Sequence, residues 1–125
     1  MAKPNLKPAS TDLETSRIKV PPHSVEAEQA VLGGLMLDNR RFDEISEVIS
    51  AADFYRQDHR LIFGAVERLA SESEPLDVAP LAEFLEGAGD IEDAGGLSYL
   101  AELAEKTPGA ANIRAYADIV RERSI

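Results

Sequence analysis

Apolar residues recur at intervals of three to four positions through most of the chain after residue 24, the spacing that places side chains on one face of an α-helix. The first such stripe follows Ser24, a residue type that favours helix N-termini because its hydroxyl accepts a hydrogen bond from a free backbone N–H. Its members are Val25, Val31, Leu32, Leu35 and Met36. No segment shows sustained alternation of apolar and polar residues, so the sequence predicts an all-α fold without strands.

Five shorter stripes follow the first, and together they predict a compact bundle of about six short helices. The expected starts of the later helices are Asp38-Asn39, Asp58, Asp77, Gly95-Gly96 and Thr107-Pro108. In the last case threonine would cap the helix and proline would occupy its first position, where a missing N–H removes no hydrogen bond. Between the second and third helices, residues 53–57 predict an irregular corner that buries Phe54, with Tyr55 as a second candidate.

The two ends of the chain differ from this helical middle. Residues 1–20 are polar, contain two prolines and show no periodicity, so they predict a flexible tail. Pro21-Pro22 marks the start of a helical domain over 21–125. Residues 121–125 stay compatible with a helix and contain no glycine or proline to stop it, which indicates a domain cut from a longer protein.

The composition is typical of a cytoplasmic globular protein. Apolar residues make up 44% of the 125 residues, and no stretch is long and apolar enough to cross a membrane. The chain contains no cysteine, which excludes disulfides, thiolate zinc sites and cysteine nucleophiles. The N-terminus lacks the apolar core of a secretory signal, so we expect cytoplasmic residence.

Charge is distributed unevenly along the sequence, whose formal net charge is −10. Residues 1–20 carry four basic and two acidic side chains, whereas the other 105 residues carry nine basic and 21 acidic ones. Between Arg68 and Lys106 there are ten acidic residues and no basic one. Such a surface repels the phosphate backbone of nucleic acids, which disfavours direct DNA binding by the domain. The basic residues near the N-terminus leave a weak DNA-contacting accessory role as the alternative.

The sequence contains no motif for catalysis or for a cofactor. There is no G-x-x-x-x-G-K-[ST] phosphate loop. The run Asp90, Glu92 and Asp93 resembles the opening of a calcium loop but has Ala101 at the twelfth position, where a carboxylate is required. His23 and His59 have no partner at helical spacing, which favours capping or surface roles over metal binding. We therefore expect no catalytic residue, cofactor or metal in this chain.

Gly33 and Gly34 interrupt the first predicted helix, where each costs about 1 kcal/mol relative to alanine. One explanation is that the helix frays or bends at this point. The other is that a surface without side chains lets a second helix approach closely. Of such contacts, packing within the domain is favoured over contact between subunits.

Three blocks of the sequence resemble the N-terminal region of the bacterial replicative DNA helicases of the DnaB family. The first is PPHSVEAEQAVLGGLMLD at 21–38, and the second combines 53–55 with 59–63. The third begins with GGLSYLAEL at 95–103 and runs on to residue 122. Together the blocks cover 21–125 nearly end to end and in the family's order, whereas residues 1–20 match nothing definite.

The resemblance implies a non-catalytic assembly and docking domain from a longer helicase chain. In the family this region forms a collar on a hexameric ring, commonly as a trimer of dimers. There it recruits primase and takes part in interactions with the helicase loader during DNA replication. The ATP and Mg sites and the DNA-binding loops lie in a motor domain that is absent here. The expected partners are therefore a second copy of the chain, primase and the loader, with no membrane and with nucleic acid bound only by the motor.

Two candidate surfaces follow from this reading. The resemblance places self-association at the helices after Gly96 and Pro108, and the candidate contact residues are Leu97, Leu100 and Tyr116. The acidic stretch supplies a second surface, which a basic region of primase or of the loader would fit. Its candidate residues are Glu83, Glu86, Asp90, Glu92 and Asp93. A role in keeping the protein soluble explains the same acidic residues, and the sequence leaves both possibilities open.

Overall fold

The computed structural model describes residues 24–124; the tail predicted at 1–20 and the proline pair at 21–22 lie outside that range. The all-α prediction is confirmed, because the described residues form helices and no strand. Within that range, six α-helices and two short 3-10 helices follow one another in this order: α1 (Val25–Leu37), η2 (Asn39–Arg41), α2 (Phe42–Ile45), η3 (Ala51–Asp53), α3 (Gln57–Ser71), α4 (Val78–Gly87), α5 (Gly96–Lys106) and α6 (Ile113–Arg123).

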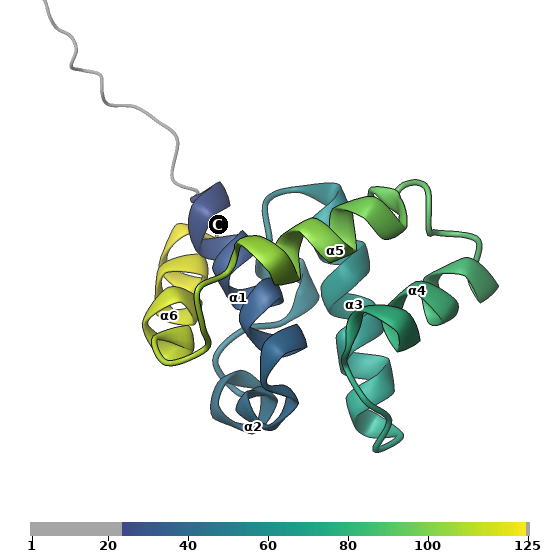
Figure 1. Cartoon of the computed structure of the whole chain (residues 1–125). Coiled ribbons are helices and arrows are strands. Elements are labelled where there is room, and N and C mark those ends of the chain that lie inside the picture. The colour runs from purple at the N-terminus through teal and green to yellow at the C-terminus, as the bar shows by residue number, and fades with distance from the viewer. Residues whose placement is uncertain (1–23, 125) are drawn as a thin grey trace, which may run out of the picture.

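Helix α1 is the centre of the domain and contacts α6, α5 and α3 (Figure 1). It begins where predicted, because the Ser24 hydroxyl accepts a hydrogen bond from the backbone N–H of Ala27 at 3.1 Å. Val31, Leu32 and Leu35 on this helix are all fully buried. A helix that is covered on several sides needs no broad polar face, which explains why apolar residues surround most of α1.

The aromatic part of the core lies where α3 meets the corner at 53–57. The Phe54 side chain is 1% exposed, and its ring centroid lies 4.9 Å from that of Phe63 on α3. The Phe63 ring also packs against Phe42, with 6.2 Å between centroids. The burial predicted for this corner is confirmed for Phe54 and wrong for Tyr55, which is 58% exposed. Because Phe54 has an extended backbone, the next side chain points away from it.

The side chain of Asn39 joins the end of α1 to the connection between α3 and α4. Its Nδ2 donates a hydrogen bond to the carbonyl of Leu35 at 2.8 Å, and its Oδ1 accepts one from the backbone N–H of Leu76 at 3.0 Å. Leu76 is buried, so its N–H needs a partner inside the protein. The two bonds therefore fix the start of the α4 segment against α1.

The N-cap predicted for the third helix at Asp58 lies two residues earlier in the structure. Helix α3 begins at Gln57 and has Arg56 at its N-cap position. The Asp58 carboxylate accepts a hydrogen bond from the backbone N–H of His59 at 2.7 Å and pairs with Arg56 at 2.5 Å. Asp58 thus stabilises the first turn of the helix from within it.

The start predicted for the sixth helix is wrong by several residues. Thr107 ends α5 instead of opening α6, and its extended backbone (φ −83°, ψ 122°) is the conformation that a following proline favours. The Thr107 hydroxyl donates a hydrogen bond to the carbonyl of Leu103 at 2.8 Å. Helix α6 begins only at Ile113 and ends at Arg123, so the helical continuation expected beyond 121 stops before Ser124, which is extended.

Candidate functional site

Helix α1 and the end of α5 approach each other closely at Gly33. A Cβ added to Gly33 would overlap the Thr107 hydroxyl and the Leu103 carbonyl, and it would lie 2.8 Å from Thr107 Cβ. A Cβ added to Gly34 would lie 3.3 Å from Cδ1 of Ile113, on α6. The prediction that the glycine pair serves packing within the domain is therefore confirmed. This packing holds the connection between α5 and α6 against α1.

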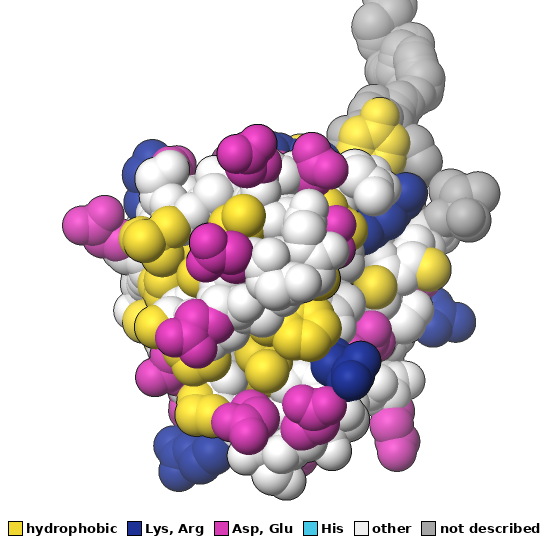
Figure 2. All heavy atoms as spheres, turned by 90° about the vertical axis from the view of Figure 1, so that its right-hand side faces the viewer, with side chains coloured by type: hydrophobic (Ala, Val, Ile, Leu, Met, Phe, Trp, Pro, Cys, Tyr) yellow, Lys and Arg dark blue, Asp and Glu magenta, His cyan; other side chains and the backbone are white. Residues whose placement is uncertain are grey.

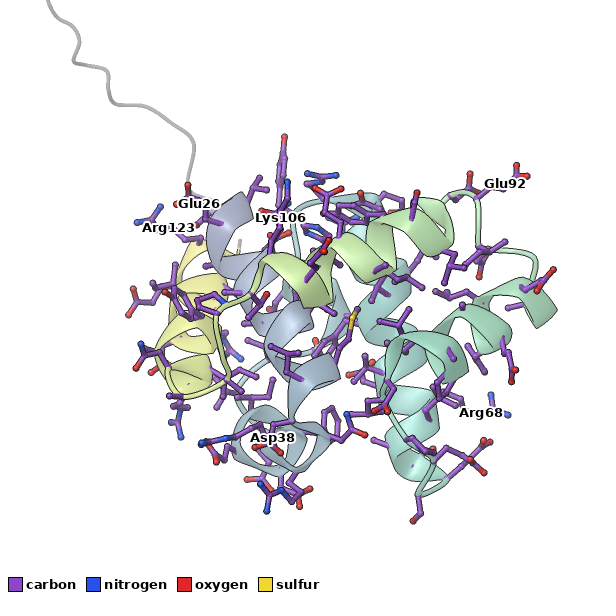
Figure 3. All side chains as sticks on the ribbon, viewed as in Figure 1. Glu26, Asp38, Arg68, Glu92, Lys106 and Arg123 are labelled. Atoms are coloured by element: carbon purple, nitrogen blue, oxygen red, sulfur yellow. The ribbon has the colours of Figure 1, made fainter. Side chains whose placement is uncertain are left out.

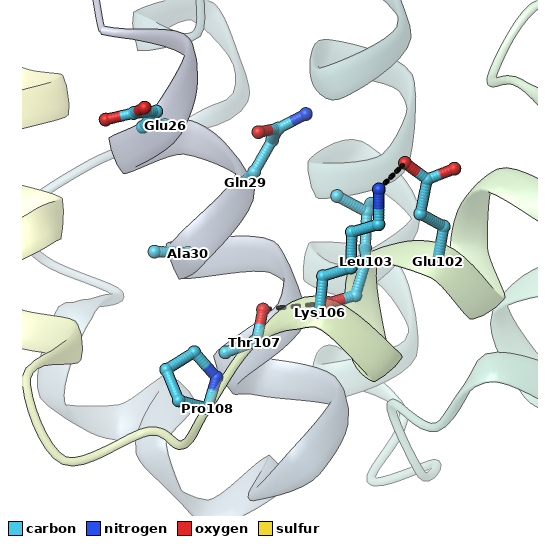
Figure 4. Close-up of a pocket in the computed structure, with 8 residues that line it drawn as sticks. All are labelled: Glu26, Gln29, Ala30, Glu102, Leu103, Lys106, Thr107 and Pro108. Carbon is cyan, nitrogen blue, oxygen red and sulfur yellow. Dashed lines mark hydrogen bonds and ion pairs between the residues drawn. The ribbon is translucent and has the colours of Figure 1, made fainter.

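The surface beside this contact is hollowed into a groove (Figure 4). Its first half lies between α1 and the end of α5 and is lined by Glu26, Gln29, Ala30, Glu102, Leu103, Lys106, Thr107 and Pro108. Its second half shares Ala30, Thr107 and Pro108 with the first and continues to Tyr116 on α6. Lys106 is paired with Glu102 at 3.1 Å, and the Thr107 hydroxyl is bonded to a carbonyl. The lining thus offers contact area and no activated nucleophile.

A buried histidine links three helices beneath this surface. His59 on α3 is fully buried, and its Nδ1 lies 2.7 Å from Oε1 of Glu28 on α1. Its Nε2 lies 2.7 Å from the hydroxyl of Tyr99 on α5, which also accepts a hydrogen bond from Gln29 at 3.1 Å. The second Glu28 oxygen accepts from the backbone N–H of Tyr55 at 2.7 Å. Because a carboxylate only accepts, every partner is satisfied when Nδ1 donates to Glu28 and Tyr99 donates to Nε2.

Ring stacking and an arginine close the outer side of this His59 network, which comprises Glu28, Gln29, His59 and Tyr99. The His59 and Tyr99 rings are stacked, with centroids 5.9 Å apart and planes at 9°. The Arg56 guanidinium lies 5.7 Å from the Tyr99 centroid.

Two pKa shifts accompany this arrangement. The hydrogen bond to Asp58 raises the pKa of Arg56, which keeps the guanidinium charged beside the ring. Desolvation raises the pKa of Tyr99, so its hydroxyl stays protonated and able to donate. Because His59 is closed to solvent, the network orders the fold and has no access to a substrate.

The sequence analysis missed this network. Capping or surface placement was expected for His59, and burial against Glu28 and Tyr99 corrects that expectation. Its partners lie 31 and 40 residues away on other helices, so no residue spacing within one helix predicts these contacts. The available signal was the position of Glu28, which lies three and four residues before Val31 and Leu32 and therefore on the apolar face.

The acidic residues predicted as a partner surface gather at the end of the molecule formed by α4, the turn after it and the start of α5. Glu83, Glu86, Glu92 and Asp93 are exposed, and Asp90 is half-buried beside them. We call these five residues, together with Leu97, the acidic end. Figure 2 shows this side of the molecule, where acidic side chains surround hydrophobic ones. In Figure 3, Glu92 lies at the outer tip of the turn, on the opposite side from Arg123 of α6.

The structure separates the three residues predicted for self-association. Leu97 is 57% exposed on the first turn of α5 and belongs to the acidic end. Leu100 is fully buried, because the inward stripe of α5 runs through Leu100 and Leu103, so in this structure it presents no surface for a contact between copies. Tyr116 is 37% exposed on α6, on the far side of α1 from the start of α5 (Figure 1). Leu97 and Tyr116 therefore lie on different surfaces.

The turn that resembles a calcium loop is organised by its backbone. The N–H of Asp90 donates to the carbonyl of Leu85 at 2.8 Å, and the carbonyl of Asp90 accepts from the N–H of Ala94 at 2.9 Å. Among residues 24–124, no three His, Asp or Glu side chains are placed to hold a metal ion together. No helix in this described part is long and apolar enough to cross a membrane.

The described residues form a small helical domain with a groove, an acidic end and a buried internal network. The chain belongs to the family of DnaB-like helicase N-terminal domains, whose model matches residues 20–122. It is 49% identical to the replicative DNA helicase DnaB of Haemophilus influenzae over 124 residues, which are 99% of this chain and 26% of that protein. It is 45% identical to the DnaB of Geobacillus stearothermophilus over 107 residues, or 86% of this chain and 24% of that protein. The chain thus spans about a quarter of the length of these relatives.

Two solved structures share the fold. The N-terminal domain of DnaB helicase from Mycobacterium tuberculosis aligns with a TM-score of 0.80 at 36% identity, over 83% of this chain and 72% of that one. The corresponding domain from Helicobacter pylori, described with its interactions with primase, aligns with a TM-score of 0.60 at 24% identity, over 76% and 73%. The family resemblance seen in the three sequence blocks is therefore confirmed.

Proposed function

We propose that this chain is the assembly and partner-docking domain of a hexameric replicative DNA helicase. The observation that carries the proposal is the family match over residues 20–122, in a chain that covers about a quarter of the helicases it resembles. ATP and Mg binding, ATP hydrolysis and DNA unwinding would then belong to a motor domain outside residues 1–125. The groove and the acidic end supply contact surfaces, and the His59 network holds them in place.

Primase and the helicase loader are the proposed partners from outside the ring. The related domain from Helicobacter pylori has been described with its interactions with primase, which supports the first. The proposal that the loader is a partner rests on the family resemblance alone. The groove lies at the end of α5 that carries Lys106, and the acidic end lies at the other end of that helix. Two partners can therefore dock without competing for one surface.

A second copy of the chain is the third proposed partner. With Leu100 in the core, Leu97 and Tyr116 are the exposed candidates for contact between copies. A dimer uses the same patch on both subunits, whereas a ring needs a second, different contact between dimers. A trimer of dimers would therefore require two surfaces of this kind on each domain.

Sedimentation velocity of the chain, of primase from the same organism and of their mixture tests the docking role. We expect the mixture to contain a species that sediments faster than either protein alone. A mixture that behaves as the sum of its parts at the highest soluble concentration would contradict the proposal. Robust ATP hydrolysis by the purified chain would contradict it as well, because it would place chemistry in this domain.

A weak contact with DNA is the alternative, and its support is the four basic residues within 1–20, outside the described part of the chain. Four phosphate contacts at most give binding that is lost as salt rises. Labelled single-stranded DNA, titrated first at low and then at physiological salt, separates the two functions. Binding that persists at physiological salt would favour the DNA-contacting role.

A further inference from the structure

We propose that the acidic end binds a basic, amphipathic segment of another protein, with Leu97 at the apolar centre of the contact and the carboxylates around it. The inference rests on the proposed docking function and adds the chemistry of one partner. It also assigns Leu97 to that partner instead of to a second copy of the chain.

The apolar centre is formed by side chains that the domain leaves uncovered. Leu97 is 57% exposed, compared with 50% for Leu37, and Phe84 and Ile91 are partly buried against the core. The Arg68 guanidinium lies 6.0 Å from the Phe84 ring centroid and is paired with Glu72 at 2.8 Å. The basic group at the margin is thus already neutralised. An apolar area ringed by polar groups is typical of a protein interaction site.

The carboxylates around this centre have no cations of their own. None of the five acidic residues of the acidic end forms an ion pair with a described residue, and the sequence between Arg68 and Lys106 offers no basic side chain. Several carboxylates elsewhere in the domain are paired, as in Asp38 with Arg40, Glu44 with Arg41, Asp58 with Arg56 and Asp118 with Arg114. Lysine or arginine side chains of a partner would relieve this uncompensated negative charge and would accelerate association.

A second copy of the chain fits this surface poorly. A two-fold contact places the same patch of both subunits face to face, so the acidic end would meet another acidic end. Like charges in a contact of this kind oppose binding. The surface around Tyr116 has a different character, because α6 carries Arg114, Arg121 and Arg123 among its acids. Charge thus favours α6 over the acidic end for contact between copies, and it favours a basic partner at the acidic end.

The surface is held rigid before any partner arrives. Gly95 has a positive φ of 104°, and a Cβ at this position would lie 2.7 Å from Tyr99 Cβ, so the turn before Leu97 requires glycine. Two residues after Leu97, the Tyr99 hydroxyl is fixed by His59 and Gln29. A preorganised surface loses little conformational entropy on binding, which favours recognition by a short segment.

Calorimetry with designed peptides tests the partner chemistry. The probe is a helical peptide of about 18 residues with a leucine stripe along one face and lysines beside it. One control peptide replaces every lysine with glutamate, and a second keeps the lysines but scrambles the leucine stripe. The chain should bind the first peptide, bind the scrambled one more weakly and ignore the glutamate peptide. Equal binding of the first and scrambled peptides would overturn the apolar part of the inference.

Matched charge reversals separate a defined surface from net charge. Glu86→Lys with Glu92→Lys should weaken binding of the lysine peptide about tenfold, because two attractive contacts become repulsive. Asp43→Lys with Glu47→Lys changes the net charge equally at two exposed residues near α2 and should weaken binding roughly twofold or less. Equal weakening by the two pairs would overturn the inference, since net charge alone would then explain the binding.

Matched leucine substitutions test the centre. Leu97→Ser should lower peptide affinity, whereas Leu37→Ser, at a leucine that is 50% exposed at the end of α1, should leave it unchanged. If Leu97→Ser instead abolished self-association in sedimentation and left peptide binding intact, Leu97 would belong to a second copy and the inference would fail. In that case an intact complex with primase would leave the proposed function standing.

Discussion

The acidic end and the His59 network both involve α5, yet they arise in different ways. The acidic end is drawn from one continuous stretch, residues 83–97, and its side chains are exposed except for that of half-buried Asp90. The network joins Glu28, His59 and Tyr99, which lie 31 and 40 residues apart and are removed from water in part or completely. The acidic end is a surface whose binding properties local substitutions can change. The His59 network is the buried support of that surface, and we call it the frame. Changes in the network should therefore alter stability, and changes in the acidic end should alter binding.

The largest effect is expected for Glu28→Ala. It leaves the Nδ1–H of fully buried His59 without its acceptor and removes the hydrogen bond from the Tyr55 N–H, and we expect a loss of about 2–5 kcal/mol in the free energy of unfolding. Glu26→Ala, two residues earlier on the exposed side of α1, is the control and should change stability by about 0.5 kcal/mol or less. Urea denaturation followed by circular dichroism measures both. Equal losses would mean that the network contributes nothing specific.

Gly33→Ala should give the next largest effect. The added methyl group would meet the Leu103 carbonyl, which is backbone and cannot rotate away, so we expect a loss of about 1–3 kcal/mol. Gly64→Ala is the control, because nothing lies within 4 Å of a Cβ there, and it should gain up to about 1 kcal/mol from helix propensity. A stable Gly33→Ala variant would show that α5 does not pack on α1 as described.

Tyr99→Phe should cost about 1 kcal/mol, the usual contribution of a hydrogen bond, because His59 Nε2 loses its partner. The same variant tests a pH dependence. Burial raises the pKa of Tyr99, so the folded state holds this proton more tightly than the unfolded state. The stabilisation is complete below the ordinary tyrosine pKa of about 10 and is lost as pH rises through the higher folded value. Above a pH of about 10 the midpoint temperature of thermal unfolding should therefore fall less steeply with pH in Tyr99→Phe than in the wild type.

The smallest effect on stability is expected at the acidic end. Glu86→Lys with Glu92→Lys should shift the free energy of unfolding by about 0.5 kcal/mol or less, because both side chains are exposed and unpaired. Any gain from reduced repulsion should disappear at high salt. A large loss of stability would show that these residues belong to the frame and would blur the distinction between the two regions.

The fold was predictable where short-range chemistry decides it. Ser24 caps α1 as expected, and the apolar stripes mark the buried faces of the helices. The start predicted for the sixth helix at Thr107-Pro108 was wrong because threonine followed by proline is compatible with the start of a helix and also with the end of one. The contact between Gly33 and the end of α5 selects the second, and that contact depends on the folded arrangement.

In the candidate site, too, features set by neighbouring residues were predictable from the sequence, whereas contacts between distant residues were not. The acidic end was predictable as a set of residues, because its members are near neighbours in sequence. Leu100 is buried because of the direction in which α5 faces the core. The apolar stripe alone does not reveal this direction, since it contains both buried Leu100 and exposed Leu97. The pairing of Glu28 with His59 depends on α1 and α3 lying side by side, so it required the structure.

The most direct test of the docking account is a titration of the isotope-labelled chain with primase, followed by the backbone amide signals of each residue. The account predicts that signals shift at the groove around Tyr116 or at the acidic end around Leu97. The amides of Glu28 and His59 should keep their positions, because the frame does not change when a partner binds. Unchanged spectra throughout the titration, or shifts that spread through the buried network, would contradict it.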